Sequence, residues 1–204
     1  MKKKQDKLNL VLKIIIALFG LGLTIAHFID PVAWPKVWSY IVTIILPFAP
    51  DIFKLFGINM TVRLQIAYVL FLGLAMVMGI DFDLYKTWYI FGNPCFDKIA
   101  HTLSGVLAAF VAKEILDNNY EGKNIKVTGG KTIVKHYDTR FTWLFIVSFV
   151  ALTAAGWECF EFLYDQITGG NMQELISSGL DDTMWDILGA IVAGIISAFP
   201  LCKK

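Results

Sequence analysis

Residues 141–165 read FTWLFIVSFVALTAAGWECFEFLYD, and this stretch decides the fold class. It is almost entirely apolar or small until three carboxylates arrive at its end, Glu158, Glu161 and Asp165, and it holds no Lys or Arg. A helix needs about 20 predominantly apolar residues to cross a bilayer. The stretch therefore predicts a transmembrane helix over about 141–164 that gathers its acids at one end.

The composition of the whole chain agrees with a membrane protein. The 204 residues are 56% hydrophobic and only 17% charged, with a mean hydropathy of +0.61. Soluble domains carry about 25% charged residues. The net charge of +1 gives no electrostatic case for nucleic-acid binding. The three cysteines, Cys95, Cys159 and Cys202, are too widely spaced for a CxxC zinc motif or a disulfide framework.

Five further apolar runs accompany the first. The predicted spans cover about 9–29, 36–53, 64–80, 97–116, 141–164 and 183–201. Of the six predictions, the span at about 36–53 is the weakest because Pro47 and Pro50 interrupt it. Membrane helices nevertheless tolerate proline where neighbours satisfy the freed carbonyls. We predict an all-α fold, a polytopic transmembrane helical bundle in which residues 1–204 form a single integral membrane domain.

Basic residues indicate the orientation. If the N-terminus is cytoplasmic, only Lys36, Lys86 and Lys98 of the 18 basic residues fall on the outer side, as the positive-inside rule requires. Six spans then place both termini and the loop at about 117–140 in the cytoplasm. Within that loop NIKVTGGKTIV (124–134) predicts a small hairpin. We expect a multi-pass protein of the plasma membrane.

The last three predicted spans carry ionisable residues at their outer ends. These are Asp97 and His101 in the fourth span, Glu158 and Glu161 in the fifth, and Asp182 and Asp186 in the sixth. Residues three or four apart share one face of a helix, so each pair points the same way. Asp165 and Asp181 lie further out and are expected to sit in water at the interface.

Small residues lie on or near the same faces. They are Gly105, Ala108 and Ala112 in the fourth span, Ala151, Ala154 and Ala155 in the fifth, and Ala190, Ala193, Gly194 and Ser197 in the sixth. Small side chains let membrane helices approach closely. The three spans are therefore predicted to pack together with their acids converging.

Clustered carboxylates in a low-dielectric site need compensation, and three arrangements provide it. In the first, one divalent metal ion is held by His101, Glu158 and Asp186, while Glu161, Asp97 and Asp182 supply catalytic carboxylates or complete the shell. In the second, the acids share protons in a proton or cation path. In the third, they sit in interfacial water. The residues alone leave these alternatives open.

Three motifs carry a family resemblance. FDKIAHTLSG (96–105), WE-x2-E from Glu158, and DDTMWD (181–186) occur in this order and resemble the YjdF-type family of bacterial membrane proteins, whose biochemical role is not established. The chain is also distantly similar to the VanZ-like group, associated with glycopeptide resistance, in which D-x3-N-x2-G corresponds to Asp182-x3-Asp186-x2-Gly189. The resemblance implies a shared fold and set of positions, not a reaction.

Three classes of function follow from these features. The first is a metal-dependent enzyme acting on a lipid-linked or cell-envelope substrate. The second is a non-catalytic accessory protein of antibiotic tolerance that binds an outer-leaflet lipid or cell-wall precursor. The third is a proton- or cation-coupled transporter. The expected partners are membrane lipids and such a precursor, without nucleic acid. The sequence contains neither HExxH nor GxSxG, so it matches neither the zincin nor the nucleophile-elbow motif.

Overall fold

The computed structural model describes residues 2–33, 35–90, 93–119, 124–126, 132–134, 137–170, 172–173 and 180–202. In this part of the chain six helical segments are long and apolar enough to span a membrane, which confirms the predicted all-α transmembrane fold. They are Lys3–Ile29, Val37–Leu55, Val62–Asp81, Phe96–Asn118, Thr139–Thr168 and Leu180–Leu201. The chain divides into two compact units, Met1–Ala100 and His101–Lys204, and the boundary falls in the second turn of a continuous helix.

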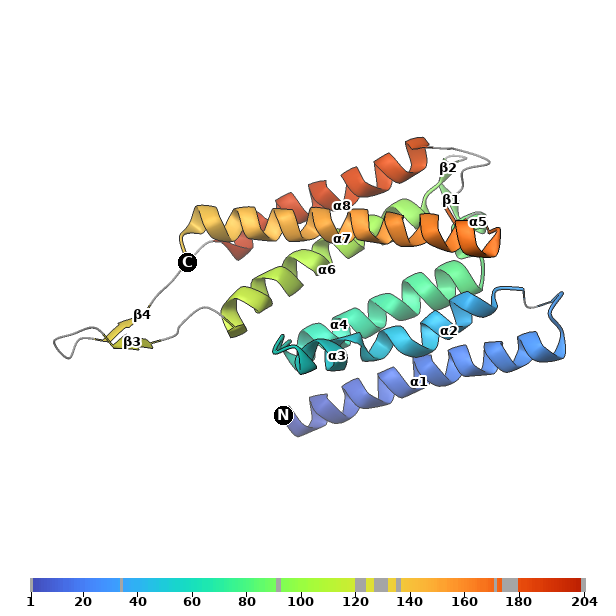
Figure 1. The fold of residues 1–204 in the computed structure, drawn as a ribbon, viewed down its shortest axis with the longest axis horizontal. Helices are drawn as coiled ribbons and strands as arrows, with labels where there is room; N and C mark the ends of the chain where they lie inside the picture. The colour runs from blue at the N-terminus through green and yellow to red at the C-terminus, as the bar shows by residue number, and fades with distance from the viewer. Residues whose placement is uncertain are drawn as a thin grey trace. The chain divides into compact units, whose positions relative to one another are not determined.

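The first unit is built from the first three spans. Its elements are α1 (Lys2–Ile29), α2 (Val37–Ile45), the 3₁₀ turn η1 (Leu46–Phe48), α3 (Ala49–Leu55), α4 (Val62–Leu72), the π-helical segment η2 (Gly73–Asp81), α5 (Leu84–Thr87), and strands β1 (Tyr89–Ile90) and β2 (Asn93–Pro94). Helix α1 packs against both α2 and α4 (Figure 1). The second span is divided into α2, η1 and α3 because Pro47 and Pro50 lack a backbone N–H, and each lies at the start of the next segment, where proline is tolerated.

Glycine makes the contact between α1 and α2 possible. A Cβ built on Gly20 would lie 2.8 Å from the Tyr40 carbonyl oxygen. Tyr40 is fully buried, as is Val69 of α4. Close approach at one small residue therefore lets the larger side chains fill the interior of this unit.

The second unit contains α6 (Phe96–Asn119), whose first turn belongs to the first unit, then β3 (Asn124–Lys126), β4 (Thr132–Val134), α7 (Thr139–Thr168) and α8 (Leu180–Leu201). Strands β3 and β4 are antiparallel with Ile125 opposite Ile133, which confirms the predicted hairpin pairing. Its predicted turn lies outside the described residues.

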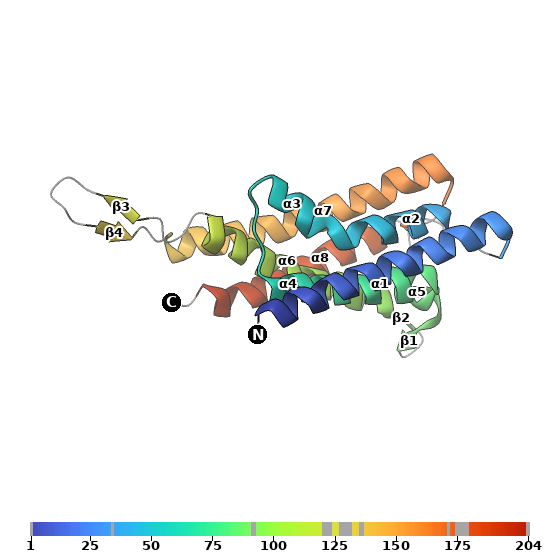
Figure 2. The same cartoon turned by 90° about the horizontal axis from the view of Figure 1, so that it is seen from below.

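Helices α6, α7 and α8 share a core of small and β-branched side chains. It comprises Ala109, Ala112, Ile146, Val150, Ala198 and Cys202. Helices α7 and α8 pack along each other (Figure 2). A Cβ on Gly194 would lie 2.7 Å from the Val150 side chain, and one on Gly105 would collide with the Ala190 backbone. The predicted close packing through small residues is confirmed at these two glycines.

Candidate functional site

The acids and the histidine gather where α6 begins, α7 ends and α8 begins. One ligand atom each from Asp97, His101 and Asp186 lies within 4.8 Å of the others, and these residues are called here the Asp–His–Asp group. His101 is 7% exposed and Asp186 is 2% exposed, while Asp97 is half-buried. Asp97 and His101 reach the same point because they are one helical turn apart on α6. The group thus combines two carboxylates and one imidazole at a largely buried position.

Glu158 lies against this group from α7. Its Oε1 atom is 3.7 Å from Nδ1 of His101, and both side chains are buried. This distance is longer than a hydrogen bond but within ion-pair range when the imidazole is protonated. A carboxylate beside a ligating histidine commonly orients the ring and raises its basicity. The geometry therefore suits Glu158 either as a further ligand or as the group that positions His101.

The other two predicted site residues are not members of the Asp–His–Asp group. Glu161 is buried and accepts a 2.6 Å hydrogen bond from Nε1 of Trp157, one turn earlier on α7. Asp182 is half-buried, one turn before Asp186 on α8. Of the six residues singled out from sequence, the structure brings three together, sets Glu158 beside His101, and leaves Glu161 and Asp182 outside that group.

The expectation that Asp165 sits in water is wrong. Its side chain is buried and accepts hydrogen bonds from the backbone N–H groups of Met172, at 2.7 Å, and Gln173, at 3.0 Å. Helix α7 ends at Thr168. The next residue, Gly169, caps the helix in a left-handed conformation (φ 67°) that suits glycine, and the chain then turns back. Asp165 is buried because it accepts hydrogen bonds from the returning chain, whereas Asp181 is exposed as predicted.

Gln173 is a site residue that the sequence did not indicate. It is 6% exposed, and its Nε2 donates to the Glu158 carbonyl oxygen at 3.3 Å. The returning chain therefore covers the helical turn that carries Glu158. A glutamine in a connecting segment has no periodic signal, so only the tertiary structure reveals this contact.

The Asp–His–Asp group has the kinds of ligand atom that could hold a metal ion. Ser104, three residues after His101 on α6, donates to the His101 carbonyl oxygen at 2.7 Å, a hydrogen bond within its own helix. Imidazole and carboxylate ligands suit zinc, iron and manganese, and three protein ligands leave a coordination position for water or substrate. Asp186 and the neighbouring Glu158 are buried carboxylates, which are costly without compensating charge; a divalent cation would supply it.

The first unit holds a network of polar side chains around the buried Lys13, which in the sequence counted only as one of the basic residues. Lys13 of α1 is 2% exposed, and its Nζ donates to Asp51 at 2.7 Å and to Gln65 at 3.1 Å. Asn9 donates to the same Gln65 oxygen at 2.9 Å. A lysine inside an apolar run is the signal that marks such a site, because it must find partners in the membrane.

A buried carboxylate lies at the end of the third span. Asp81 is 7% exposed and accepts hydrogen bonds from Ser39 at 2.6 Å and Thr43 at 3.3 Å, one turn apart on α2. Lys36 donates to the neighbouring Ile80 carbonyl oxygen and forms a 2.7 Å ion pair with Asp83. Two hydroxyl groups of α2 thus donate hydrogen bonds to Asp81, and Lys36, directly before α2, pairs with Asp83.

Comparison with known proteins supports the class of molecule without adding an activity. No curated protein and no solved structure matches the chain. A family model described as "Predicted membrane protein (DUF2238)" matches residues 8–202. The match begins in the second turn of α1 and covers the other five spans completely. The chain therefore belongs to this family of predicted membrane proteins.

Proposed function

We propose that the Asp–His–Asp group binds one divalent metal ion and that the protein is a metal-dependent enzyme acting on a lipid-linked or cell-envelope substrate. The observation that carries the proposal is the convergence of three ligand atoms within 4.8 Å at a largely buried position. An imidazole among them favours a transition metal over magnesium or calcium, which prefer oxygen ligands.

Burial weighs against the alternative that these acids simply sit in water. Asp186 and Glu158 are almost completely buried, and each would carry a negative charge into a low-dielectric region. The burial alone fits proton sharing equally well. Metal binding is preferred because His101 adds a neutral nitrogen ligand at the point where two carboxylates meet.

The residues around the group have distinct roles in this proposal. Asp97, His101 and Asp186 are ligands, and Glu158 either joins them or orients the His101 ring from 3.7 Å. A bound metal lowers the pKa of a coordinated water or polarises a phosphoryl or carbonyl oxygen. Glu161, which accepts a hydrogen bond from Trp157, is the general base, and Asp182 lies one turn nearer the start of α8 than Asp186.

Topology gives the site its location in the proposal. Cytoplasmic termini put the start of α6 at the outer face of the plasma membrane, with access to outer-leaflet lipids and cell-wall precursors. The distant motif likeness to the VanZ-like group, which is associated with glycopeptide resistance, supports a role in the cell envelope. An accessory protein of antibiotic tolerance would use the same position for binding without catalysis.

Metal stoichiometry tests the proposal. The detergent-purified protein is dialysed against zinc or manganese, and its metal content is measured for wild type, Asp186→Asn and Asp181→Asn. We expect about one ion per chain in wild type and in Asp181→Asn, whose side chain is exposed on the same helix, and loss of the ion in Asp186→Asn. Equal metal content in the two folded variants would contradict the proposal.

Transport is the second candidate because the first unit also carries buried ionisable groups within its spans. Asp81 with its two hydroxyl partners and Lys13 with Asp51 are the features typical of ion or proton pathways. Proton flux into proteoliposomes that is abolished by Asp81→Asn would favour this function. Flux equal to that of empty liposomes across the pH range would exclude proton coupling.

A further inference from the structure

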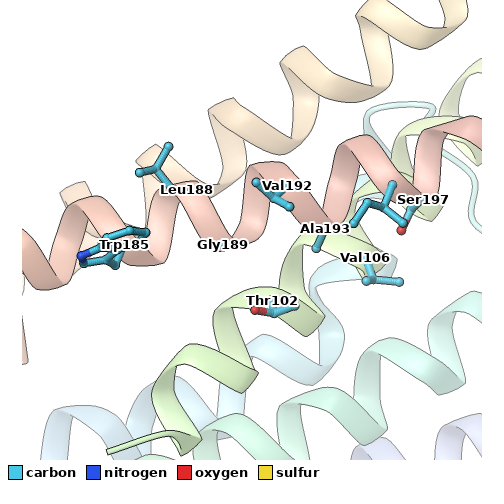
Figure 3. Close-up of a pocket in the computed structure, with 9 residues that line it drawn as sticks. Thr102, Val106, Trp185, Leu188, Gly189, Val192, Ala193 and Ser197 are labelled. Atoms are coloured by element: carbon cyan, nitrogen blue, oxygen red, sulfur yellow. The ribbon is translucent and has the colours of Figure 1, made fainter. Parts of the chain in front are cut away.

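A groove of about 440 Å³ runs along α8 on the side that faces α6. Its lining includes Thr102 and Val106 from α6, and Trp185, Gly189, Val192 and Ser197 from α8 (Figure 3). Among these six residues, only the Thr102 and Ser197 hydroxyls and the Trp185 indole are polar side-chain groups. The surface is therefore suited to hydrocarbon rather than to a polar ligand.

One end of the groove lies at the same level of α6 and α8 as the candidate metal site. Thr102 follows His101 on α6, and Trp185 precedes Asp186 on α8. From there the lining continues along α8 to Ser197, away from the acids. A molecule lying in the groove would therefore have one end at the level of the Asp–His–Asp group.

The length and the surroundings of the groove fit one lipid chain. Trp185 and Ser197 are separated by twelve positions, which correspond to about 18 Å of helix. One leaflet of the hydrocarbon core is about 15 Å deep, half of roughly 30 Å. Trp185 and Val192 are more than half exposed, at 66% and 53%, on a helix long and apolar enough to span the membrane. The groove is thus open to lipid over about the depth of a single leaflet.

We propose that this groove seats one hydrocarbon chain of a phosphate-bearing membrane lipid, whose headgroup lies at the Asp–His–Asp group. The proposal deepens the enzyme function and rests on the metal site, because carboxylates would repel a phosphate unless a cation lay between them. It names the substrate class as a phosphorylated lipid that enters sideways from the bilayer, with its chain between α6 and α8.

Gly189 keeps the groove open and provides the test. A Cβ built on Gly189 would lie 3.5 Å from Oγ1 of Thr102, an ordinary contact, so a larger side chain is expected to extend into the groove. Gly156 on α7 is the matched control, since a Cβ there meets nothing within 4 Å. Gly189→Leu and Gly156→Leu therefore add the same atoms, inside and outside the groove.

The experiment uses the full-length protein in phosphatidylcholine vesicles containing phosphatidylglycerol with a diazirine in one acyl chain. After photolysis, labelled residues are mapped by mass spectrometry, with and without excess unlabelled phosphatidylglycerol. We expect saturable labelling of Val106 and Val192, and weaker, non-saturable labelling of Leu152, which is 72% exposed on α7. Displacing two or three methylene groups should make Gly189→Leu lose groove labelling by more than about tenfold, while Gly156→Leu keeps it.

Equal, non-saturable labelling of Val192 and Leu152 in wild type would overturn the proposal, because it would mean ordinary contact with surrounding lipid. Unchanged groove labelling in Gly189→Leu would overturn it as well. Val192→Trp, at a half-exposed position, is the second blocking variant should Gly189→Leu fail to fold. Metal content is measured on the same samples. For Gly189→Leu we expect loss of groove labelling while the metal content stays at the wild-type level. If the wild-type protein holds no metal, that result refutes the metal site but does not bear on the groove.

Discussion

Gly105→Ala should both destabilise the protein and weaken metal binding. Gly105 lies one turn after His101 on α6, and Ala190 lies one turn after Asp186 on α8. The backbones approach so closely here that a Cβ on Gly105 would lie 2.7 Å from the Ala190 Cα. The contact between Gly105 and Ala190 therefore sets the distance between α6 and α8 one turn away, where His101 and Asp186 lie.

The size of the effect follows from the contact. Carbon atoms in van der Waals contact are about 3.5–4.0 Å apart, so the two helices must separate locally by roughly 1 Å. Overpacking costs about 1–3 kcal/mol, while replacing a helical glycine by alanine returns about 0.5–1 kcal/mol. A net loss of roughly 1–2 kcal/mol should lower Tm by about 2–8 °C in a chain of this length. Metal ligands tolerate displacements of about 0.2 Å, so metal affinity should fall at least about tenfold.

The assay compares thermal unfolding and zinc titration of Gly105→Ala with those of Gly156→Ala. Gly156 has open space around its Cβ position, so the same substitution there should leave metal affinity unchanged and raise stability by up to about 1 kcal/mol. Matching behaviour of the two variants would refute the inference that the α6–α8 contact sets the geometry of the site.

Other contacts lead to three further predictions. Asp51→Asn should cost about 2–3 kcal/mol, because it leaves Lys13 charged and 2% exposed. Lys13→Met should change the free energy of unfolding by less than about 1 kcal/mol, since Asp51 is 57% exposed and can be solvated. Denaturant titration of both variants checks that Asp51→Asn is the more destabilising, and an equal loss in each would contradict the reasoning. Asp165→Ala should speed amide exchange of Met172 and Gln173 by about tenfold or more, because both N–H groups lose their acceptor; Asp181→Ala is the exposed control, and unchanged exchange in Asp165→Ala would refute that role.

Hydropathy and helical spacing were sufficient for much of this architecture. Six apolar runs become six helices, and the prolines divide the second one as their missing N–H groups require. Asp97 and His101 were paired by a four-residue separation within one helix, a local relation that does not depend on tertiary contacts. The small residues at Gly105 and Gly194 marked close helix contacts because membrane helices approach through such positions.

Long-range polar contacts were beyond the sequence. Lys13 and Gln65 are separated by 52 positions, and nothing local relates them. Asp165 was placed in water from its position at a helix end, yet the chain returns through Gln173 and buries it. Spacing also gives the depth of a residue in the membrane but not the rotation of its helix, so the sequence predicted Glu158 as a ligand and Glu161 and Asp182 as catalytic carboxylates without relating them to His101 in space. Their roles in binding and catalysis remain predictions.

The most direct test of the metal site is to detect the His101 nitrogen on a bound ion. Pulsed electron paramagnetic resonance of the protein loaded with one Mn²⁺ resolves coupling to a directly coordinated ¹⁴N. The metal site proposed here predicts an imidazole nitrogen signal in wild type that disappears in His101→Gln, while the Gln variant remains folded. A wild-type spectrum with oxygen ligands alone, or an unchanged nitrogen signal in His101→Gln, would contradict it.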